Sequence, residues 1–526
     1  IGMLMPMVWP QIWENGKFRP VRALLFIPPD LRAQFAHDWE MYGKHWRLPN
    51  LAGGKYFTNG LPVLHVHAYS ELSHIKSTAM LEKIRPDLIM GDEISAFRNF
   101  ESSRTIRFRR FMGNFPDSSF CGWDASILAD SICDIWHLLA FALDEGSPTP
   151  LEEAELIKWS KALDPSSEDG YFMPGKLELL CEKWESIRSG FRRRLVETRG
   201  VIASEENALG IPLVFTERRP PKMPENLRNF LRDLRRKPGD GGWKRPDNEE
   251  FKEITEVVSC ARQLASGFYM RWRFPNGEPR EVIDDWFLKR QNWNRELRAQ
   301  LSYPAVHMDS KKLCENAAAR WFDGGCTGCA RGPREQHHVG CRDVESPPLW
   351  PSYTFLAWRA VEDTVHHVTQ TVWESDWLLE DAAAWARENP GIVWVDHPAF
   401  GHRLEQMTGF KYYGGGDAAT EELADTDTVD GSVSIICSVG ANKKGKNLQA
   451  FCRNLIVSFP ASNDIVEQFV GRTYRNGQKA EKVTVDYYLH TPELENALEK
   501  AQTRARFVHQ VMGSEQKLVY GFKRAA

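Results

Sequence analysis

The sequence lacks a hydrophobic run long enough to cross a bilayer, since no stretch approaches the about 18 apolar residues that a membrane-spanning helix needs. The apolar opening Ile1–Trp9 is short and is interrupted by Pro6, so it fits neither a membrane span nor a signal peptide. These absences exclude an integral membrane protein of the helical type. We expect no membrane partner and a cytoplasmic location.

A strong charge of one sign is also missing. The chain has 67 Lys and Arg against 71 Asp and Glu, a formal net charge of −4, which is too small for nucleic-acid binding by bulk electrostatics. Such binding would need local patches. Basic residues do gather in one region, at Arg192–Arg194, Arg228, Arg232, Arg235–Lys237 and Lys244–Arg245. They either form a solvated surface or contact DNA phosphates without sequence preference.

The cysteine spacing typical of a secreted protein with several disulfide bonds is absent too. The ten cysteines are mostly scattered, and a long chain without a secretory signal favours reduced thiols. One loop, 326–341, is the exception, with Cys326, Cys329, His337, His338 and Cys341. Three thiolates and one imidazole can close a tetrahedral Zn²⁺ site. We predict structural Zn²⁺ on Cys326, Cys329, His337 and Cys341; the alternative is a surface loop without metal.

A length of 526 residues exceeds what a single core supports and predicts two or three domains. Two regions alternate short apolar β-rich runs with helical patterns, which is typical of parallel sheets with crossover helices. The expected strands are Ala23–Ile27, Val63–Ala68, Leu88–Asp92, Ser119–Trp123, Ile392–Asp396, Val433–Cys437, Asn454–Phe459 and Val483–Leu489. We therefore predict an α/β protein with two lobes, 1–143 and 386–500, a mostly helical insertion, 144–385, and a C-terminal helix and tail, 501–526.

Asp92 and Glu93 follow the apolar run Leu88–Met90, which places an acidic pair at the carboxyl end of a strand. Parallel α/β sheets bind their ligands at that edge. One carboxylate there can hold Mg²⁺ through its waters, and the neighbour can orient an attacking water for phosphoryl transfer.

Gln468, Arg472 and Arg475 have the spacing i, i+4 and i+7, which predicts one face of a helix. Guanidinium groups meet planar anionic oxygens in a fixed fork geometry, so phosphate is the expected ligand. The alternative is a solvated basic helix end.

The segment Asp92–Asn99 resembles the Walker B box and its extension in Swi/Snf-type superfamily 2 helicases, which belong with the DEAD/DEAH-box proteins. Segments in both lobes resemble further motifs of that family in matching order, namely Leu24–Pro28, His67–Leu72, Asp134–Leu139, Gly445–Gln449 and Gln468–Gln478. Within the family, Gly267–Trp272 and Val372–Trp373 resemble stretches of helicases encoded by phages and prophages, which would place the protein in a bacterial host cytoplasm.

The resemblance implies two RecA-like lobes with ATP and Mg²⁺ between them. It assigns Asp92 and Glu93 to Mg²⁺ and water, Gln468 to the γ-phosphate or water, and Arg472 and Arg475 to the transferring phosphoryl group. It also implies a nucleic-acid partner, with double-stranded DNA favoured. The nucleic-acid contacts that it implies are Tyr69, Ser438, Lys446 and Asn447.

The chain departs from the family pattern in two places. It has no Gly-x-x-x-x-Gly-Lys-Ser/Thr phosphate loop, whose backbone N–H groups and lysine anchor the phosphates. We expect this loop just upstream of Ile1, and the alternative is true loss. The family's motif III, which couples hydrolysis to lobe movement, is replaced by Cys121–Ser126.

These features predict an ATP-dependent DNA helicase or translocase. The rival hypothesis is an inactive lobe pair that binds nucleic acid or a replication partner as a scaffold. A nuclease has no support, because no further cluster of carboxylates and lysine suits one.

Overall fold

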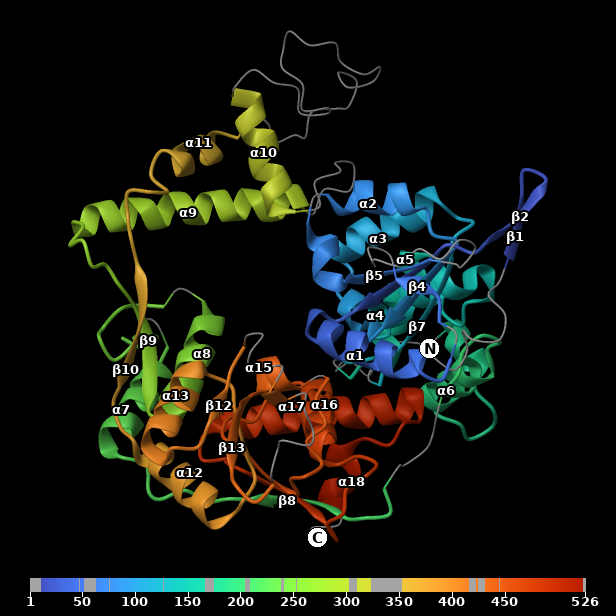
Figure 1. Ribbon diagram of the computed structural model, residues 1–526. Coiled ribbons are helices and arrows are strands. Elements are labelled where there is room, and N and C mark those ends of the chain that lie inside the picture. The colour runs from blue at the N-terminus through green and yellow to red at the C-terminus, as the bar shows by residue number, and fades with distance from the viewer. Residues whose placement is uncertain are drawn as a thin grey trace.

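Two parallel β-sheets organise the chain, and they are built mainly from its N-terminal and C-terminal parts (Figure 1). The α/β class is therefore as predicted. The computed structural model describes residues 11–46, 48–51, 63–74, 76–125, 127–165, 175–203, 209–237, 241–251, 253–301, 310–322, 352–415, 422–423, 431–443 and 445–523.

The first sheet has the strand order β4-β5-β3-β6-β7, with all strands parallel. Its strands are β3 (Ala23–Ile27), β4 (Asn50–Leu51), β5 (Val63–Ala68), β6 (Leu88–Asp92) and β7 (Ser119–Trp123). The four strands predicted in this region have the predicted bounds. Leu24 and Phe26 of β3 enter one apolar cluster, and Leu25 and Ile27 enter another. Because both faces are buried, the strand is a continuous apolar run.

Helices cover both faces of the first sheet. They are α1 (Arg32–Gly43), α2 (Ser77–Ile84), α3 (Ser103–Asn114) and α4 (Cys133–Leu143). Phe108 of α3 and Leu138 of α4 pack on one face, and Phe35 and Trp39 of α1 pack on the other. A hairpin of β1 (Gln11–Glu14) and β2 (Lys17–Pro20) projects from this part of the molecule (Figure 1).

The second sheet has the order β12-β13-β11-β14-β15-β8 and is also parallel. Its strands are β8 (Leu213–Glu217), β11 (Ile392–Val395), β12 (Tyr412–Tyr413), β13 (Ile435–Ser438), β14 (Arg453–Ile456) and β15 (Val483–Tyr487). All four strands predicted here are present, with ends that differ by a few residues. The helices that follow its strands are α13 (Pro398–Thr408), α15 (Val439–Asn442) and α16 (Asn463–Thr473).

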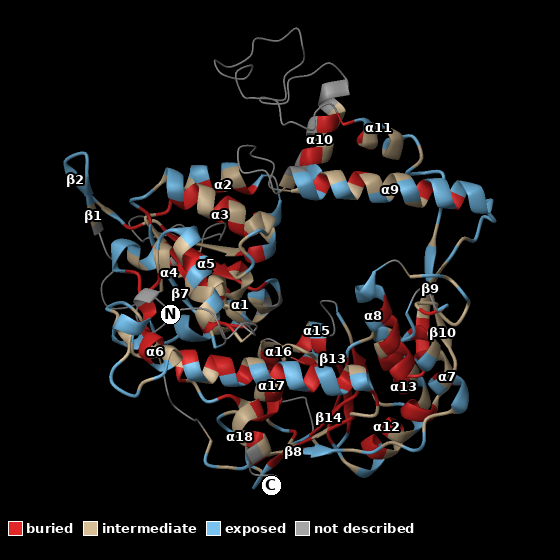
Figure 2. Cartoon of the chain, turned by 180° about the vertical axis from the view of Figure 1, so that it is seen from behind, coloured by how far each residue is buried: buried red, intermediate tan, exposed pale blue. Residues whose placement is uncertain are grey.

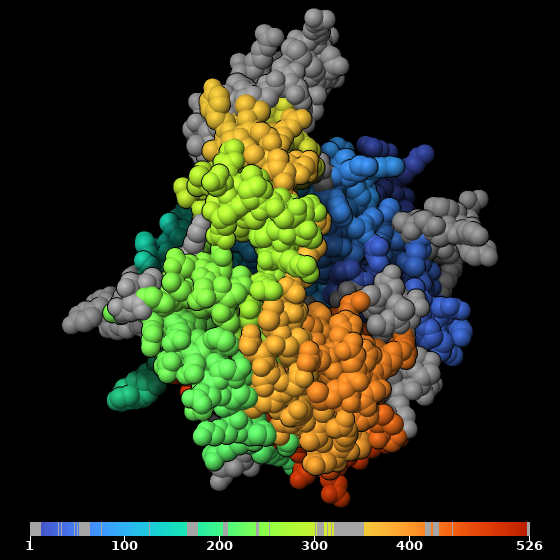
Figure 3. Space-filling model, turned by 90° about the vertical axis from the view of Figure 1, so that its left-hand side faces the viewer, coloured from blue at the N-terminus to red at the C-terminus, as the bar shows by residue number. Residues whose placement is uncertain are grey.

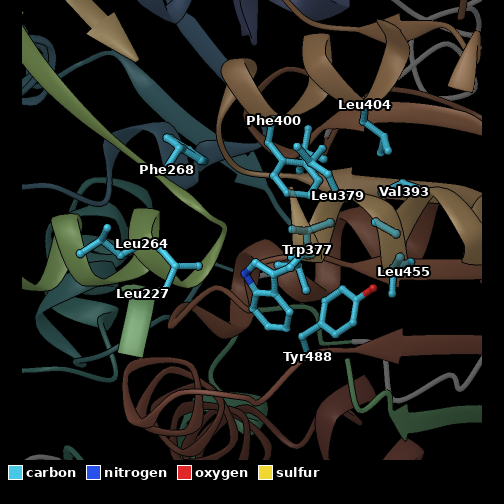
Figure 4. Packing of buried hydrophobic residues seen from close by; sticks show 14 of the residues in the cluster. Leu227, Leu264, Phe268, Trp377, Leu379, Val393, Phe400, Leu404, Leu455 and Tyr488 are labelled. Carbon is cyan, nitrogen blue, oxygen red and sulfur yellow. The ribbon is translucent and has the colours of Figure 1, made fainter. Parts of the chain in front are cut away.

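The insertion, 144–385, contributes directly to the second sheet, because β8 pairs with β15 at its edge. Its other elements are α5 (Glu153–Leu163), α6 (Ile187–Glu197), α7 (Glu225–Leu234), α8 (Ile254–Ala265), β9 (Phe268–Arg273), α9 (Arg280–Leu301), α10 (Lys311–Phe322), α11 (Tyr353–Arg359), β10 (Val368–Trp373) and α12 (Trp377–Glu388). Leu227 of α7, Leu264 of α8 and Trp377 of α12 join the largest apolar cluster beside Val393 of β11 (Figure 4). Helices make up much of the described part of this segment, and the segment is not structurally separate from the second sheet.

Helix α17 (Pro492–Met512) connects the two halves of the molecule (Figure 2). Leu498 and Ala501 pack in a cluster with the second sheet. Phe507 and Val508, further along the same helix, pack with Trp136 of α4. The chain then continues into α18 (Lys517–Lys523). One continuous helix therefore contributes to the cores beside both sheets.

Candidate functional site

The acidic pair lies at the carboxyl end of β6. Asp92 is the last residue of this strand, and Glu93 follows it with a φ of 57°. This left-handed conformation is uncommon for a residue with a side chain. It leads the chain directly into a 3-10 helix, Ile94–Phe97. Both half-buried carboxylates therefore leave the sheet at the edge where parallel α/β proteins bind ligands.

Asp124 stabilises the turn that carries Glu93. It follows the end of β7, and its Oδ2 accepts a hydrogen bond of 2.7 Å from the backbone N–H of Ser95. This N–H lies in the first turn of the 3-10 helix, where backbone donors have no partner within the helix. Sequence reasoning missed Asp124 as a site residue. Its place in the segment that departs from motif III was the available signal.

Tyr69, predicted to contact nucleic acid, lies buried next to the acidic pair. Its side chain is 1% exposed. Burial raises the pKa of its hydroxyl well above the ordinary value, and the nearby carboxylates of Asp92, Asp124 and Glu93 raise it further. A Cβ on Gly91 would lie 2.8 Å from the Tyr69 Oη, so the glycine permits this close packing. In this conformation Tyr69 packs against Phe26 and Phe97 and offers no surface to a nucleic acid.

Gln468 and Arg472 lie on α16, as predicted, but Arg475 does not. The helix ends at Thr473, and Tyr474 leaves the helical conformation with a ψ of 82°. The prediction that all three residues share one helix face is therefore wrong for Arg475. Arg475 leaves the helix face because the chain turns after Thr473. In this turn the backbone N–H of Gln478 donates to the carbonyl of Arg475 at 3.1 Å.

The two arginines nevertheless converge on one loop. The Nη1 atoms of Arg472 and Arg475 donate to the carbonyl oxygen of Lys446 at 3.3 and 3.4 Å. Arg475 also bonds the side-chain oxygen of Asn447, and the Arg472 Nε donates to the Gln468 carbonyl at 3.0 Å. The loop that resembles motif V thus holds both guanidinium groups in place.

Burial lowers the pKa of Arg472 to about 10; the neighbouring charge of Arg475 lowers it as well, and Glu93 opposes both effects. Burial also lowers the pKa of Arg475. The interaction with Glu93 joins a residue after β6 of the first sheet to one on α16 beside the second. Desolvated cations of this kind are stabilised by an anionic ligand.

A direct ion pair also joins these two elements. Arg98, just after the acidic turn, donates to Asp464 in the first turn of α16 at 3.0 Å. Burial alone would raise the pKa of Asp464, but Arg98, Ser462 and Lys443 together hold it below the ordinary value. Sequence reasoning did not select Asp464, because no local pattern relates it to a residue so far away in the chain.

The other predicted nucleic-acid contacts are mostly covered. Ser438 is 9% exposed and Lys446 is 2% exposed. Asn447 is half-buried and occupied by its bond to Arg475. These side chains support the loops at the edge of the second sheet, so they do not form an exposed nucleic-acid surface in this conformation. Gln468, at 6% exposed, is also covered.

The predicted zinc ligands Cys326, Cys329, His337 and Cys341 lie outside the described residues. Within the part of the chain that is described, no group of three or more His, Cys, Asp or Glu side chains is arranged to hold a metal ion. Of the helices described, none is both long and apolar enough for a membrane crossing.

The candidate site thus consists of two carboxylates at the edge of one sheet and two arginines beside the other, and Glu93 acts electrostatically on Arg472. Its two halves have opposite charge and come from sequence regions that are far apart. A scan against protein-family models and a search of curated proteins find no match for this chain.

Proposed function

We propose that this chain is an ATP-dependent DNA helicase or translocase of the superfamily 2 type, in which the two parallel sheets belong to two RecA-like lobes. The observation that carries the proposal is geometric: the Arg98–Asp464 ion pair holds the turn after the acidic pair against α16, and Arg472 and Arg475 converge on the Lys446 carbonyl at the other end of that helix. Such a site is complete only when both lobes are in place. A reaction that depends on lobe closure requires a site composed of residues from both lobes.

Apart from the phosphate loop, which this sequence lacks, the residues at the site fit the phosphates of a nucleoside triphosphate with Mg²⁺. Arg472 and Arg475 donate only to neutral oxygens in the bonds described above, and neither forms an ion pair with a described residue. Two adjacent half-buried cations favour an anion with several oxygens, such as a polyphosphate. Asp92 is the residue that would hold Mg²⁺ through its waters. When bound, the metal ion neutralises charge on the phosphate oxygens.

The remaining residues have distinct roles in this proposal. Glu93 orients the attacking water and accepts its proton. Arg472 and Arg475 stabilise the negative charge that develops on the transferring group. Gln468 lies one helical turn before Arg472 and positions the γ-phosphate or the water. Movement of α16 relative to β6 would then couple ATP hydrolysis to changes in DNA binding.

Two substitutions test the proposal in the intact protein. Glu93→Gln removes the base and Arg475→Ala removes one cation, so each should lower DNA-stimulated ATP hydrolysis by about 100-fold or more. The measurement is phosphate release with and without duplex DNA. Glu82→Gln and Arg199→Ala are matched controls, because both residues are exposed and neither belongs to the site.

Unchanged turnover in either Glu93→Gln or Arg475→Ala would refute the enzyme. DNA binding by a wild-type protein that never hydrolyses ATP would support the scaffold instead.

A further inference from the structure

Positive charge is concentrated in one short segment around α7. Residues 217–237 carry eight basic and three acidic side chains, a net charge of +5, in a chain whose net charge is −4. Every residue of this segment is described. A local field of this sign attracts polyanions even when the whole molecule is weakly acidic.

The other basic groups noted in the sequence are engaged within the protein. Arg193 donates to the Leu180 carbonyl at 2.8 Å and pairs with Glu185 at 3.0 Å. Arg194 donates to the carbonyl of Pro148 at 2.8 Å. Arg245 and Lys244 pair with Asp247 and Glu250 at 2.7 and 3.2 Å. Their positive charges are therefore used in local structure. Within the α7 segment, Arg218 and Arg235 are engaged in the same way, by Asp381 and Glu493 at 2.7 Å each, and the candidates for contact with a partner are the other basic residues of the segment.

On α7 the basic side chains point outward. Leu227, Leu231 and Leu234 are buried in the largest apolar cluster and fix the helix on the second-sheet side of the molecule. Figure 4 shows Leu227 in this cluster. Arg228 and Arg232, one helical turn apart, are exposed. The helix lies on the outer flank of this half, away from the first sheet (Figure 1), and its green surface faces the viewer in the lower half of Figure 3.

We define the basic surface as the five exposed residues Lys222, Arg228, Arg232, Arg236 and Lys237. Lys222, Arg228 and Lys237 form no ion pair with any residue in the described ranges. Arg232 and Arg236 share Asp233 at 3.3 and 3.5 Å, at exposed positions where such pairs contribute little. The surface therefore keeps most of its positive charge available to a partner.

A cavity of about 260 Å³ adjoins this surface. The loop that precedes α7 lines it with Arg219 and Lys222, and Trp377 and His490 line it from α12 and from just after β15. Glu217 and Arg218, at the end of β8, also line it, and Arg218 is paired with Asp381. It lies where β8 and β15 end, which is the ligand-binding edge of a parallel sheet. A hollow with basic residues at its rim offers a place for one phosphate of a longer chain.

Nucleic acid fits this surface better than an acidic protein does. The segment 217–237 contains none of the exposed large hydrophobic side chains of the described residues, whereas protein interfaces need an apolar or aromatic core. Six of its eight basic residues are arginine, the residue that meets phosphate in fork geometry. Contacts of this type position a backbone and do not read its sequence.

We infer that the basic surface binds the phosphate backbone of duplex DNA, as a second contact outside the site between the two sheets. The inference rests on the proposed nucleic-acid partner but not on ATP hydrolysis. Such a contact would keep DNA attached to the second half of the molecule while the halves move, and it would act on any sequence.

The test uses the full chain and a fluorescently labelled DNA duplex, with binding measured by anisotropy at about 50 to 200 mM salt and without nucleotide. The variant is Lys222→Gln/Arg228→Gln/Arg232→Gln. The matched control, Lys500→Gln/Arg199→Gln/Arg506→Gln, removes the same charge from exposed positions elsewhere. We expect about tenfold weaker binding for the variant and a salt slope reduced by about 0.9 for each lost phosphate contact.

Equal DNA affinity in the wild type and the variant, or equal weakening in the variant and the control, would overturn the inference. Labelled poly-glutamate serves as a second probe. If it binds the wild type as tightly as DNA and loses binding in the variant, an acidic protein replaces DNA as the partner and the inference fails. A variant that loses DNA binding, in a protein whose wild type hydrolyses no ATP, would refute the proposed enzyme but retain the basic surface.

Discussion

At the residue scale, Gly91 controls how closely Tyr69 packs against the acidic pair. A Cβ at this position would lie 2.5 Å from the Ile94 Cγ2 and 2.8 Å from the Tyr69 Oη. Neither neighbour has room to move, because Tyr69 is 1% and Ile94 is 3% exposed. The absence of a side chain is thus a packing requirement next to Asp92.

Gly91→Ala should therefore lower the free energy of unfolding by about 1 to 3 kcal/mol through overpacking. Urea denaturation measures the change. Gly113→Ala is the control, since no atom lies within 4 Å of the added methyl group at that helical position, and alanine there should stabilise the protein by about 0.5 to 1 kcal/mol. Equal effects of the two substitutions would show that the contacts around Gly91 are not tight.

At the scale of elements, the candidate site depends on the relative position of the turn after β6 and helix α16. Arg98 and Asp464 join them with side chains that are only 16% and 15% exposed. A pair shielded to this degree is screened less by water than a surface pair. Arg98 also donates to the carbonyl of Ile127 at 3.2 Å, so a single substitution would remove more than the ion pair.

A double-mutant cycle isolates the pair. We expect Arg98→Gln and Asp464→Asn, measured singly and together by urea denaturation, to give a coupling free energy of about 1 to 2 kcal/mol that shrinks at high salt. The Arg98 bond to the Ile127 carbonyl and the hydrogen bond that the Ser462 hydroxyl donates to Asp464 are separate from the pair. The cycle subtracts them, because each is lost equally in the single and double variants. Additive effects within about 0.3 kcal/mol would mean that the pair does not link the two elements.

At the scale of the whole molecule, α17 is the structural link between the two sheets. Phe507 is fully buried in the cluster that contains Trp136 of α4, while Leu498 and Ala501 of the same helix belong to the second-sheet cluster. Arg188 of α6 adds a bond of 2.7 Å to Gln510. Unfolding of either half therefore disturbs the helix that stabilises the other.

Phe507→Ala should cost about 3 to 5 kcal/mol and separate thermal unfolding into two calorimetric transitions, because the first-sheet half loses its anchor on α17. Phe400→Ala, a substitution of equal size in the cluster around the second sheet, should lower stability without this separation. A single transition in both variants would show that α17 does not couple the halves.

Much of this protein follows from local sequence. Strands such as Ala23–Ile27 and Leu88–Asp92 were predictable to the residue, because buried parallel strands are short unbroken apolar runs. Asp92, Glu93 and Arg472 were predictable as site candidates, since their chemistry and their places at element ends are both visible in the chain. The role of the site in ATP hydrolysis remains a proposal that rests on the resemblance.

Other features were decided only by the tertiary structure. The pairing of β8 with β15 and of Arg98 with Asp464 joins segments hundreds of residues apart, and no local period encodes such a match. The burial of Tyr69 and Lys446 depends on which segments of the folded protein pack over them. Local sequence was enough to specify which segments form strands and which residues carry charge. Packing decided which charges meet across the two sheets and which, like those on α7, stay exposed to solvent.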